Sequence, residues 1–163
     1  MSLFTIYIVD DEELIHNSLR SYIRRNFPDV EIVPFFSAVM FIRYLKKHNV
    51  ENSLVILDHH FDIGISGSEA VGEIRRISKT LPIIFLTGVT DDSDITYTSD
   101  VNIHFKAKPI SEMELRRTIK ECIEVTETVS GLHDKVSSLE LEVQSLAEQV
   151  QQTKQWAYDA LQS

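Results

Sequence analysis

Residues 54–67 read LVILDHHFDIGISG. Four apolar residues run directly into a carboxylate, Asp58, and two histidines and a polar, glycine-containing segment follow. A short apolar run bounded by turn residues is typical of a strand that is buried on both faces of a sheet. The stretch therefore predicts a buried strand, and it raises the question whether Asp58 only ends that strand or also carries out chemistry.

Short apolar strands alternate with helical patterns on both sides of this stretch. Strands are predicted at 4–9, 31–36, 54–57, 82–86 and 102–106, and helices at 12–26, 37–48, 70–77, 89–98 and from 111 onward. Such alternation is typical of βαβ crossovers and a parallel sheet with helices on both faces. We expect an α/β fold with a doubly wound, flavodoxin-like, five-stranded parallel sheet in the order 2-1-3-4-5. Pro34 predicts an edge position for the second strand.

The composition excludes several classes of function. Of the 163 residues 43% are hydrophobic and 25% are charged, which is ordinary for a globular protein. The net charge of −9 argues against direct nucleic-acid binding, which depends on neutralising phosphates. Apolar runs of four or five residues are too short to span a membrane. The single cysteine, Cys122, excludes an internal disulfide, and the cytoplasm is the expected location.

Polar side chains follow four of the predicted strands directly. Asp10 and Asp11 follow the first strand, Asp58 ends the third, Thr87 ends the fourth and Lys108 lies just past the fifth. In this class of sheet, sites lie outside the carboxyl ends of the strands. Each residue alone is more often a strand-end cap, but five at successive strand ends predict one site.

The chemistry of this set indicates phosphoryl transfer. Three neighbouring carboxylates remain ionised most readily around a hard divalent cation, and Mg²⁺ prefers such oxygen ligands. A lysine ammonium and a threonine hydroxyl both stabilise phosphoryl oxygens. The set predicts an aspartate nucleophile that accepts a phosphoryl group in a Mg²⁺-dependent reaction.

With these residues in place, residues 1–125 resemble a response-regulator receiver domain of two-component signalling. The resemblance rests on Asp10-Asp11, Asp58, Thr87-Gly88, Lys108-Pro109 and Phe105. It implies that Asp58 is the residue phosphorylated by a histidine kinase, and that the protein is a regulatory phosphoacceptor rather than an enzyme. It also implies a cis peptide bond between Lys108 and Pro109.

The resemblance implies roles for the other residues as well. Mg²⁺ would be bound by Asp10, Asp11, Asp58 and the backbone carbonyl of His60. Thr87 and Lys108 would hold the phosphoryl oxygens. Thr87 and Phe105 would be the switch residues, the Phe105 rotamer following phosphorylation. Independently of the resemblance, the predicted helix at 89–98 is polar and has few apolar anchors, so it is either displaced by the same event or simply an exposed helix.

The loop after Asp58 departs from the family pattern. Phe61 and Asp62 replace the usual Met-Pro, and the expected glycine comes one residue late, at Gly67. These changes predict a reshaped loop with added negative charge near the site. His59 and His60 are either plain exposed loop residues or, in the case of His60, a group that tunes hydrolysis of the acyl phosphate.

Residues 126–163 are predicted to form a coiled coil. Apolar or small residues recur at spacings of three and four, at Val129, Leu132, Val136, Leu139, Val143, Leu146, Val150, Thr153, Ala157 and Ala160. Valine at position a with leucine at d favours a parallel two-stranded coil. In that register Lys135 at g faces Glu140 at e of the second chain. The alternative is a helix that folds back on its own receiver domain.

The expected organisation is therefore a receiver domain at 1–125 and a dimerisation and signalling helix at 126–163, a truncated linker to an output domain. The expected partners are a histidine kinase and a second copy of the chain. Two other functions stay open. One is a pseudo-receiver that acts as a phosphorylation-independent scaffold, and the other is a phosphatase with an aspartyl nucleophile.

Overall fold

The computed structural model describes residues 3–88 and 100–162. Its elements, in chain order, are β1 (Thr5–Val9), α1 (Glu13–Asn26), β2 (Glu31–Phe35), α2 (Ala38–Leu45), β3 (Ser53–Asp58), α3 (Gly67–Ile77), β4 (Ile83–Thr87), β5 (Ile103–Ala107) and α4 (Glu112–Gln162). The helix predicted at 89–98 lies outside the described residues. The chain divides into two compact units, residues 1–126 and 127–163.

The five strands form one parallel sheet in the order β2-β1-β3-β4-β5, which confirms the predicted sheet. Pro34 lies in β2 at the edge of the sheet, also as predicted, because an edge strand can lack one backbone donor. The predicted helix at 37–48 is shorter than expected and ends at Leu45, where the chain tightens into a turn with the Lys47 amide bonded to the Tyr44 carbonyl.

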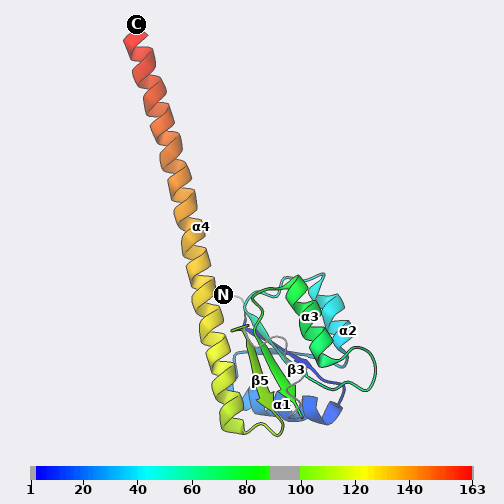
Figure 1. Cartoon of the computed structure of the whole chain (residues 1–163). Coiled ribbons are helices and arrows are strands. Elements are labelled where there is room, and N and C mark those ends of the chain that lie inside the picture. The colour runs from blue at the N-terminus through cyan, green and yellow to red at the C-terminus, as the bar shows by residue number, and fades with distance from the viewer. Residues whose placement is uncertain (1–2, 89–99, 163) are drawn as a thin grey trace. The chain divides into compact units, whose positions relative to one another are not determined.

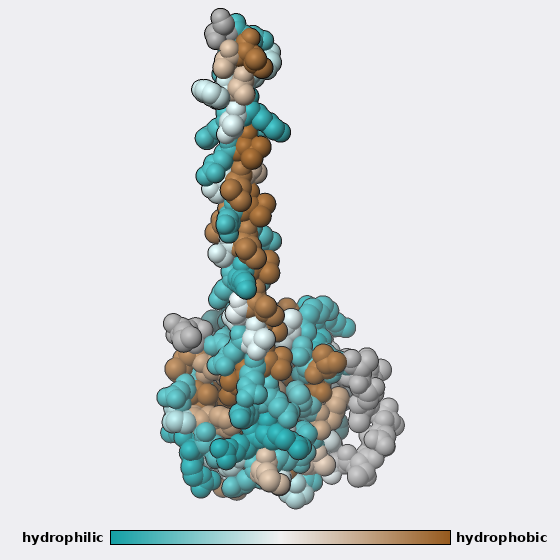
Figure 2. All heavy atoms as spheres, turned by 90° about the vertical axis from the view of Figure 1, so that its left-hand side faces the viewer, coloured by the Kyte–Doolittle hydropathy of each residue, from teal (hydrophilic) through white to brown (hydrophobic). Residues whose placement is uncertain are grey.

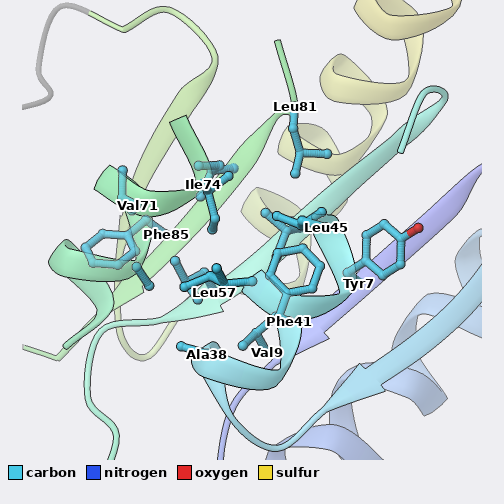
Figure 3. Packing of buried hydrophobic residues seen from close by; sticks show 14 of the residues in the cluster. Tyr7, Val9, Ala38, Phe41, Leu45, Leu57, Val71, Ile74, Leu81 and Phe85 are labelled. Atoms are coloured by element: carbon cyan, nitrogen blue, oxygen red, sulfur yellow. The ribbon is translucent and has the colours of Figure 1, made fainter. Parts of the chain in front are cut away.

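Alternate residues of each central strand enter two separate cores, one on each face of the sheet. In β3, Val55 and Leu57 pack against α2 and α3, whereas Leu54 and Ile56 pack against α1 and the first turns of α4. Figure 3 shows the first of these cores, with Phe41 of α2 and Ile74 of α3 lying over the strands. Because both faces are covered, β3 is buried at every position, as its apolar sequence predicts.

Polar groups of the α/β unit can gather at the carboxyl ends of the strands, because the helices cover both faces of the sheet. Helices α2 and α3 lie on one side of the sheet and α1 on the other (Figure 1). Apolar side chains fill the space between the layers, so the charged residues that follow the strands gather at one edge. Within residues 3–88 and 100–162, no helix has the length and apolar character that crossing a membrane requires.

The second unit is the C-terminal part of α4 and forms a single helix. The side chains of residues 127–162 are exposed, apart from the half-buried Ser137. Nine of its large apolar residues are Val129, Leu132, Val136, Leu139, Val143, Leu146, Val150, Trp156 and Leu161. Figure 2 shows the valine and leucine side chains among them as a brown stripe along the helix. An apolar stripe without a packed neighbour is unusual for a stable helix in water.

Candidate functional site

Three carboxylates come together at the carboxyl end of the sheet. Asp10 and Asp11 follow β1, and Asp58 is the last residue of β3, the neighbouring strand. One carboxylate oxygen from each lies within 4.8 Å of the others. This proximity follows from the parallel register, in which Val9 of β1 is paired with Leu57 of β3.

Asp58 is buried and forms the centre of the group. Its Oδ1 accepts a hydrogen bond from the Lys108 ammonium at 2.6 Å and another from the His59 amide at 2.9 Å. A buried carboxylate is costly unless it is paired and hydrogen-bonded, and Asp58 has both kinds of partner. The ion pair therefore joins the end of β3 to the residue that follows β5.

Asp10 is also buried, with 2% of its surface exposed. Its Oδ1 accepts the Glu12 amide at 2.9 Å, and its Oδ2 lies 3.8 Å from the Lys108 ammonium. Burial raises the pKa of the Asp10 carboxyl, and the neighbouring Asp58 carboxylate raises that pKa further, whereas the Glu12 amide and Lys108 lower it. A cation placed among the three carboxylates would favour the ionised form of Asp10.

Asp11 is more exposed and connects the first strand to the loop after β3. Its Oδ2 accepts the Asp62 amide at 2.7 Å. Sequence reasoning treated Asp62 as added negative charge and missed this contact, because a backbone amide leaves no signal in the residue type. The loop after Asp58 is thus joined directly to one of the three carboxylates.

Lys108 and Thr87 complete the group of strand ends. The Lys108 amide donates to the Thr87 carbonyl at 2.7 Å, so the ends of β4 and β5 lie side by side. The Lys108-Pro109 peptide bond is cis, as expected. Thr87 is half-buried as the last residue of β4.

Phe105 lies in β5 and reaches the site through aromatic neighbours. Its ring contacts Phe85 edge to face, with centroids 5.6 Å apart, and Phe85 contacts His59 in the same way at 5.4 Å. His59 in turn contacts His60 at 4.6 Å. Four rings therefore connect the predicted switch aromatic to the loop that follows Asp58.

The two histidines differ in their surroundings. His60 is exposed, as expected of a loop residue. His59 is half-buried, and its Nδ1 atom makes no hydrogen bond with any residue that the structure describes. The expectation of an exposed loop residue is therefore wrong for His59, because its ring fills the space beside Phe85.

The structure around Gly67 leaves no room for a side chain at that position. A Cβ atom there would lie 2.5 Å from the Asp58 carbonyl oxygen and 2.6 Å from the His59 Cα. The Gly67 amide donates to the His59 carbonyl at 2.9 Å, so α3 begins directly against the end of β3. Within the loop Gly64 has φ of +107°, a conformation that favours glycine.

His16 is a residue near the site that sequence reasoning missed. It is buried in α1, and its Nε2 lies 2.6 Å from the Asp10 carbonyl oxygen. Because a carbonyl can only accept, Nε2 carries the proton. The available signal was its spacing of three from Leu19 on the apolar face of the helix. His16 holds the backbone of Asp10 in place.

The arrangement suits a hard divalent cation and a phosphoryl group. Asp10, Asp11 and Asp58 supply only oxygen donors, which are the ligands that Mg²⁺ prefers, and an incomplete set leaves coordination positions for water and a phosphoryl oxygen. Lys108 supplies a positive charge within hydrogen-bonding distance of the central carboxylate. The residues present therefore fit both groups.

Comparison with known proteins finds similarity over most of the first compact unit, residues 1–126. The family model described as the response regulator receiver domain matches residues 6–120. A receiver domain protein (CheY-like) from Methanospirillum hungatei JF-1 has a similar structure, with 20% identity, a TM-score of 0.67 and coverage of 78% of this chain and 98% of that one.

Two further solved structures have a similar fold. The response regulator StyR is 23% identical with a TM-score of 0.71, covering 85% of this chain and 68% of that one. A receiver domain protein from Clostridium thermocellum is 22% identical with a TM-score of 0.66, covering 78% and 99%. At these identities the likeness shows the fold. No curated protein sequence matches the chain.

Proposed function

Because the chain belongs to the response regulator receiver domain family, we propose that it accepts a phosphoryl group on Asp58 from a histidine kinase and transmits that state in two-component signalling. One observation carries the proposal. The buried Asp58 carboxylate lies 2.6 Å from the Lys108 ammonium and beside the carboxylates of Asp10 and Asp11. A structural ion pair alone does not need a third carboxylate, Asp11, beside the two that Lys108 contacts.

The transfer proceeds by attack of an Asp58 carboxylate oxygen on the phosphorus of a phosphohistidine. The new O–P bond forms as the P–N bond breaks, and the imidazole leaves with the electron pair of that bond. The product is an acyl phosphate on Asp58. Lys108 pairs with the phosphoryl oxygens that replace its present carboxylate partner, and the Thr87 hydroxyl donates to another.

Magnesium fits the acidic end of the same site. Asp10, Asp11 and Asp58 would hold the ion together with the His60 carbonyl, and the bound ion would offset the negative charge on the phosphoryl oxygens. Two hydrogen bonds keep the first two carboxylates in position: the Glu12 amide binds Asp10 and the Asp62 amide binds Asp11. These amides orient carboxylate oxygens without competing for the cation.

Phosphorylation would be read through Thr87 and Phe105. A phosphoryl oxygen on Asp58 would attract the Thr87 hydroxyl at the end of β4. The movement of Thr87 toward the phosphoryl group would change the space beside Phe105, and the Phe105 ring would adopt a different rotamer. The half-buried position of Phe105 supports such a change, because a fully packed ring would have no alternative rotamer.

The signal would leave through a parallel dimeric coiled coil formed by residues 126–163. The support is the apolar stripe of α4, whose side chains are about half exposed in the single chain, among them Val136 at 51% and Leu139 at 50%. Pairing two such stripes would bury them, which is the main source of stability in a coiled coil. Phosphorylation would act on the packing of this dimer.

Intact-mass spectrometry after incubation with Mg²⁺ and acetyl phosphate tests the phosphoacceptor role. Wild type should gain one phosphoryl group, and Asp58→Asn should gain none. Omitting Mg²⁺ should abolish the gain in wild type. A receiver domain of known activity, run in parallel, controls for the donor.

Two outcomes would contradict the proposal. No adduct, while the control receiver is modified, would favour the phosphorylation-independent scaffold. Steady release of phosphate from phosphate esters would favour the aspartyl phosphatase.

A further inference from the structure

The a and d positions of α4 change from large to small side chains in its last three turns. Positions a and d carry valine and leucine as far as Val150, and then Thr153, Ala157 and Ala160. Small side chains at these positions bury little surface. Two large apolar side chains nearby are instead exposed at the flanks, Trp156 with 72% and Leu161 with 87% of its surface accessible.

The heptad register places these two residues at complementary positions. Trp156 occupies position g, directly before the a residue Ala157, and Leu161 occupies position e, directly after the d residue Ala160. In a parallel, in-register pair of helices, a g side chain faces the e side chain five residues later in the second chain. Five residues separate 156 from 161, so Trp156 faces Leu161 of the partner subunit.

The charges along the same helix agree with this register. Lys135 at g faces Glu140 of the partner subunit, which is an attractive pair. The remaining g–e pairs contain no like charges: Thr128 with His133, Glu142 with Ala147, and Gln149 with Lys154. An antiparallel pair overlapping the whole stripe would instead place Trp156 opposite Lys135 of the partner subunit and leave Leu161 opposite a threonine. The parallel arrangement is the one that matches apolar with apolar and positive with negative.

We propose that Trp156 packs on Leu161 of the partner subunit in a second copy of this chain, forming an apolar contact on each side of the alanine layers. The proposal rests on the proposed coiled-coil dimer and specifies how its C-terminal part is held together. The contact compensates for the small a and d residues, because the flanking rings cover the alanines and exclude water from the seam.

The opposite side of the helix has a different character. Tyr158 accepts a hydrogen bond from Gln162 at 2.8 Å, and Gln155 donates to Asp159 at 2.8 Å, both along the helix surface. Leu141, at position f, is 69% exposed and lies away from the a/d seam. It therefore provides a matched control, the same residue type on the solvent side of the dimer.

Trp156 is the single tryptophan of the chain, so its fluorescence reports directly on this contact. The full chain is measured over a dilution series, with sedimentation analysis at the same concentrations. Wild-type emission should be blue-shifted in the dimer and move to longer wavelength as the dimer dissociates. Leu161→Ala should shift dimer emission to longer wavelength and raise the dimer Kd about tenfold. Leu141→Ala should behave as wild type in both measurements.

The outcomes separate the contact from the dimer. A stable dimer whose emission matches the monomer, or does not respond to Leu161→Ala, would overturn the contact and leave the proposed dimer standing. A chain that stays monomeric at every concentration would overturn both. An equal response to Leu141→Ala would also overturn the contact, because the effect would then not depend on the seam.

Discussion

At the scale of single residues, Gly67 determines how closely the first turn of α3 approaches the end of β3, which carries the proposed phosphoacceptor Asp58. The hydrogen atom in place of a side chain lets its backbone contact the Asp58 carbonyl and the His59 Cα. Those two residues are the proposed phosphoacceptor and the first residue of the loop after β3. A side chain at position 67 would therefore also displace the backbone of Asp58.

Replacing Gly67 with alanine should reduce both stability and phosphorylation. The new Cβ would lie 2.5 Å from a backbone oxygen and 2.8 Å from Phe85 Cε2, so the backbone must move. We expect a loss of roughly 2–3 kcal/mol in the free energy of unfolding, measured with urea, and slower phosphorylation by acetyl phosphate.

Gly131→Ala is the matched control for this prediction, because among the described residues no atom outside its own stretch of helix backbone lies within 4 Å of a Cβ at that position. It should leave phosphorylation unchanged and raise helix stability by about 0.5–1 kcal/mol. Unchanged stability and phosphorylation in Gly67→Ala would show that the loop adapts freely.

At the scale of elements, Arg75 joins α3 to the segments before β4 and β5. Its guanidinium donates to the Asp100 carboxylate at 2.5 Å and to the Leu81 carbonyl at 2.7 Å. The arginine is 9% exposed, so these partners compensate for the burial of its charge. The contact holds Asp100, three residues before β5, against α3, the helix that follows the loop after Asp58.

Asp100→Asn should destabilise the chain in a pH-dependent way. Burial alone would raise the pKa of Asp100, but the hydrogen bonds from Arg75 and the Asn102 amide outweigh it and lower that pKa. A lowered carboxyl pKa stabilises the fold above the pKa of the unfolded chain, and this stability is lost as the pH falls through the folded-state pKa.

Wild type should therefore exceed Asp100→Asn by about 1–2 kcal/mol in unfolding free energy near pH ~7, and the difference should shrink below pH ~4. Urea unfolding of both proteins across this range measures it. A difference that is constant with pH would indicate that the carboxylate charge contributes nothing.

At the scale of the whole molecule, the chain consists of a compact α/β unit and a helix whose apolar side chains have no packed partner within the chain among the residues described. The two units depend on different sources of stability. The first buries two cores within one chain, whereas the second would bury its stripe against another helix in the proposed dimer. Stability of the helical unit should therefore depend on protein concentration.

Val143→Asp should abolish the proposed dimer and leave the receiver fold intact. An aspartate at a central a position would bury a charge in the seam, so we expect the dimer Kd to rise by at least roughly a hundredfold. Leu141→Asp, with the charge on the outer side, should leave the Kd close to wild type. Sedimentation velocity measures both, and loss of association in both variants would contradict the assigned seam.

The sequence by itself determined the sheet order, the edge position of β2 and the set of strand-end residues Asp10, Asp11, Asp58, Thr87 and Lys108. These follow from hydrophobic periodicity and from chain topology, because parallel strands connected by helices must end at the same edge. The a/d stripe was likewise readable, since it depends only on spacing along one helix.

Only the tertiary structure decided how the site is held. The bond from the Asp62 amide to Asp11, the hydrogen bond between His16 and the Asp10 carbonyl, and the backbone contact at Gly67 join segments far apart in sequence or use backbone atoms that every residue possesses. Such contacts cannot be predicted from the spacing or the type of residues in the sequence. They exist only once packing has fixed the distance between loops, which is why the loop after Asp58 could be recognised as unusual but not built from the sequence.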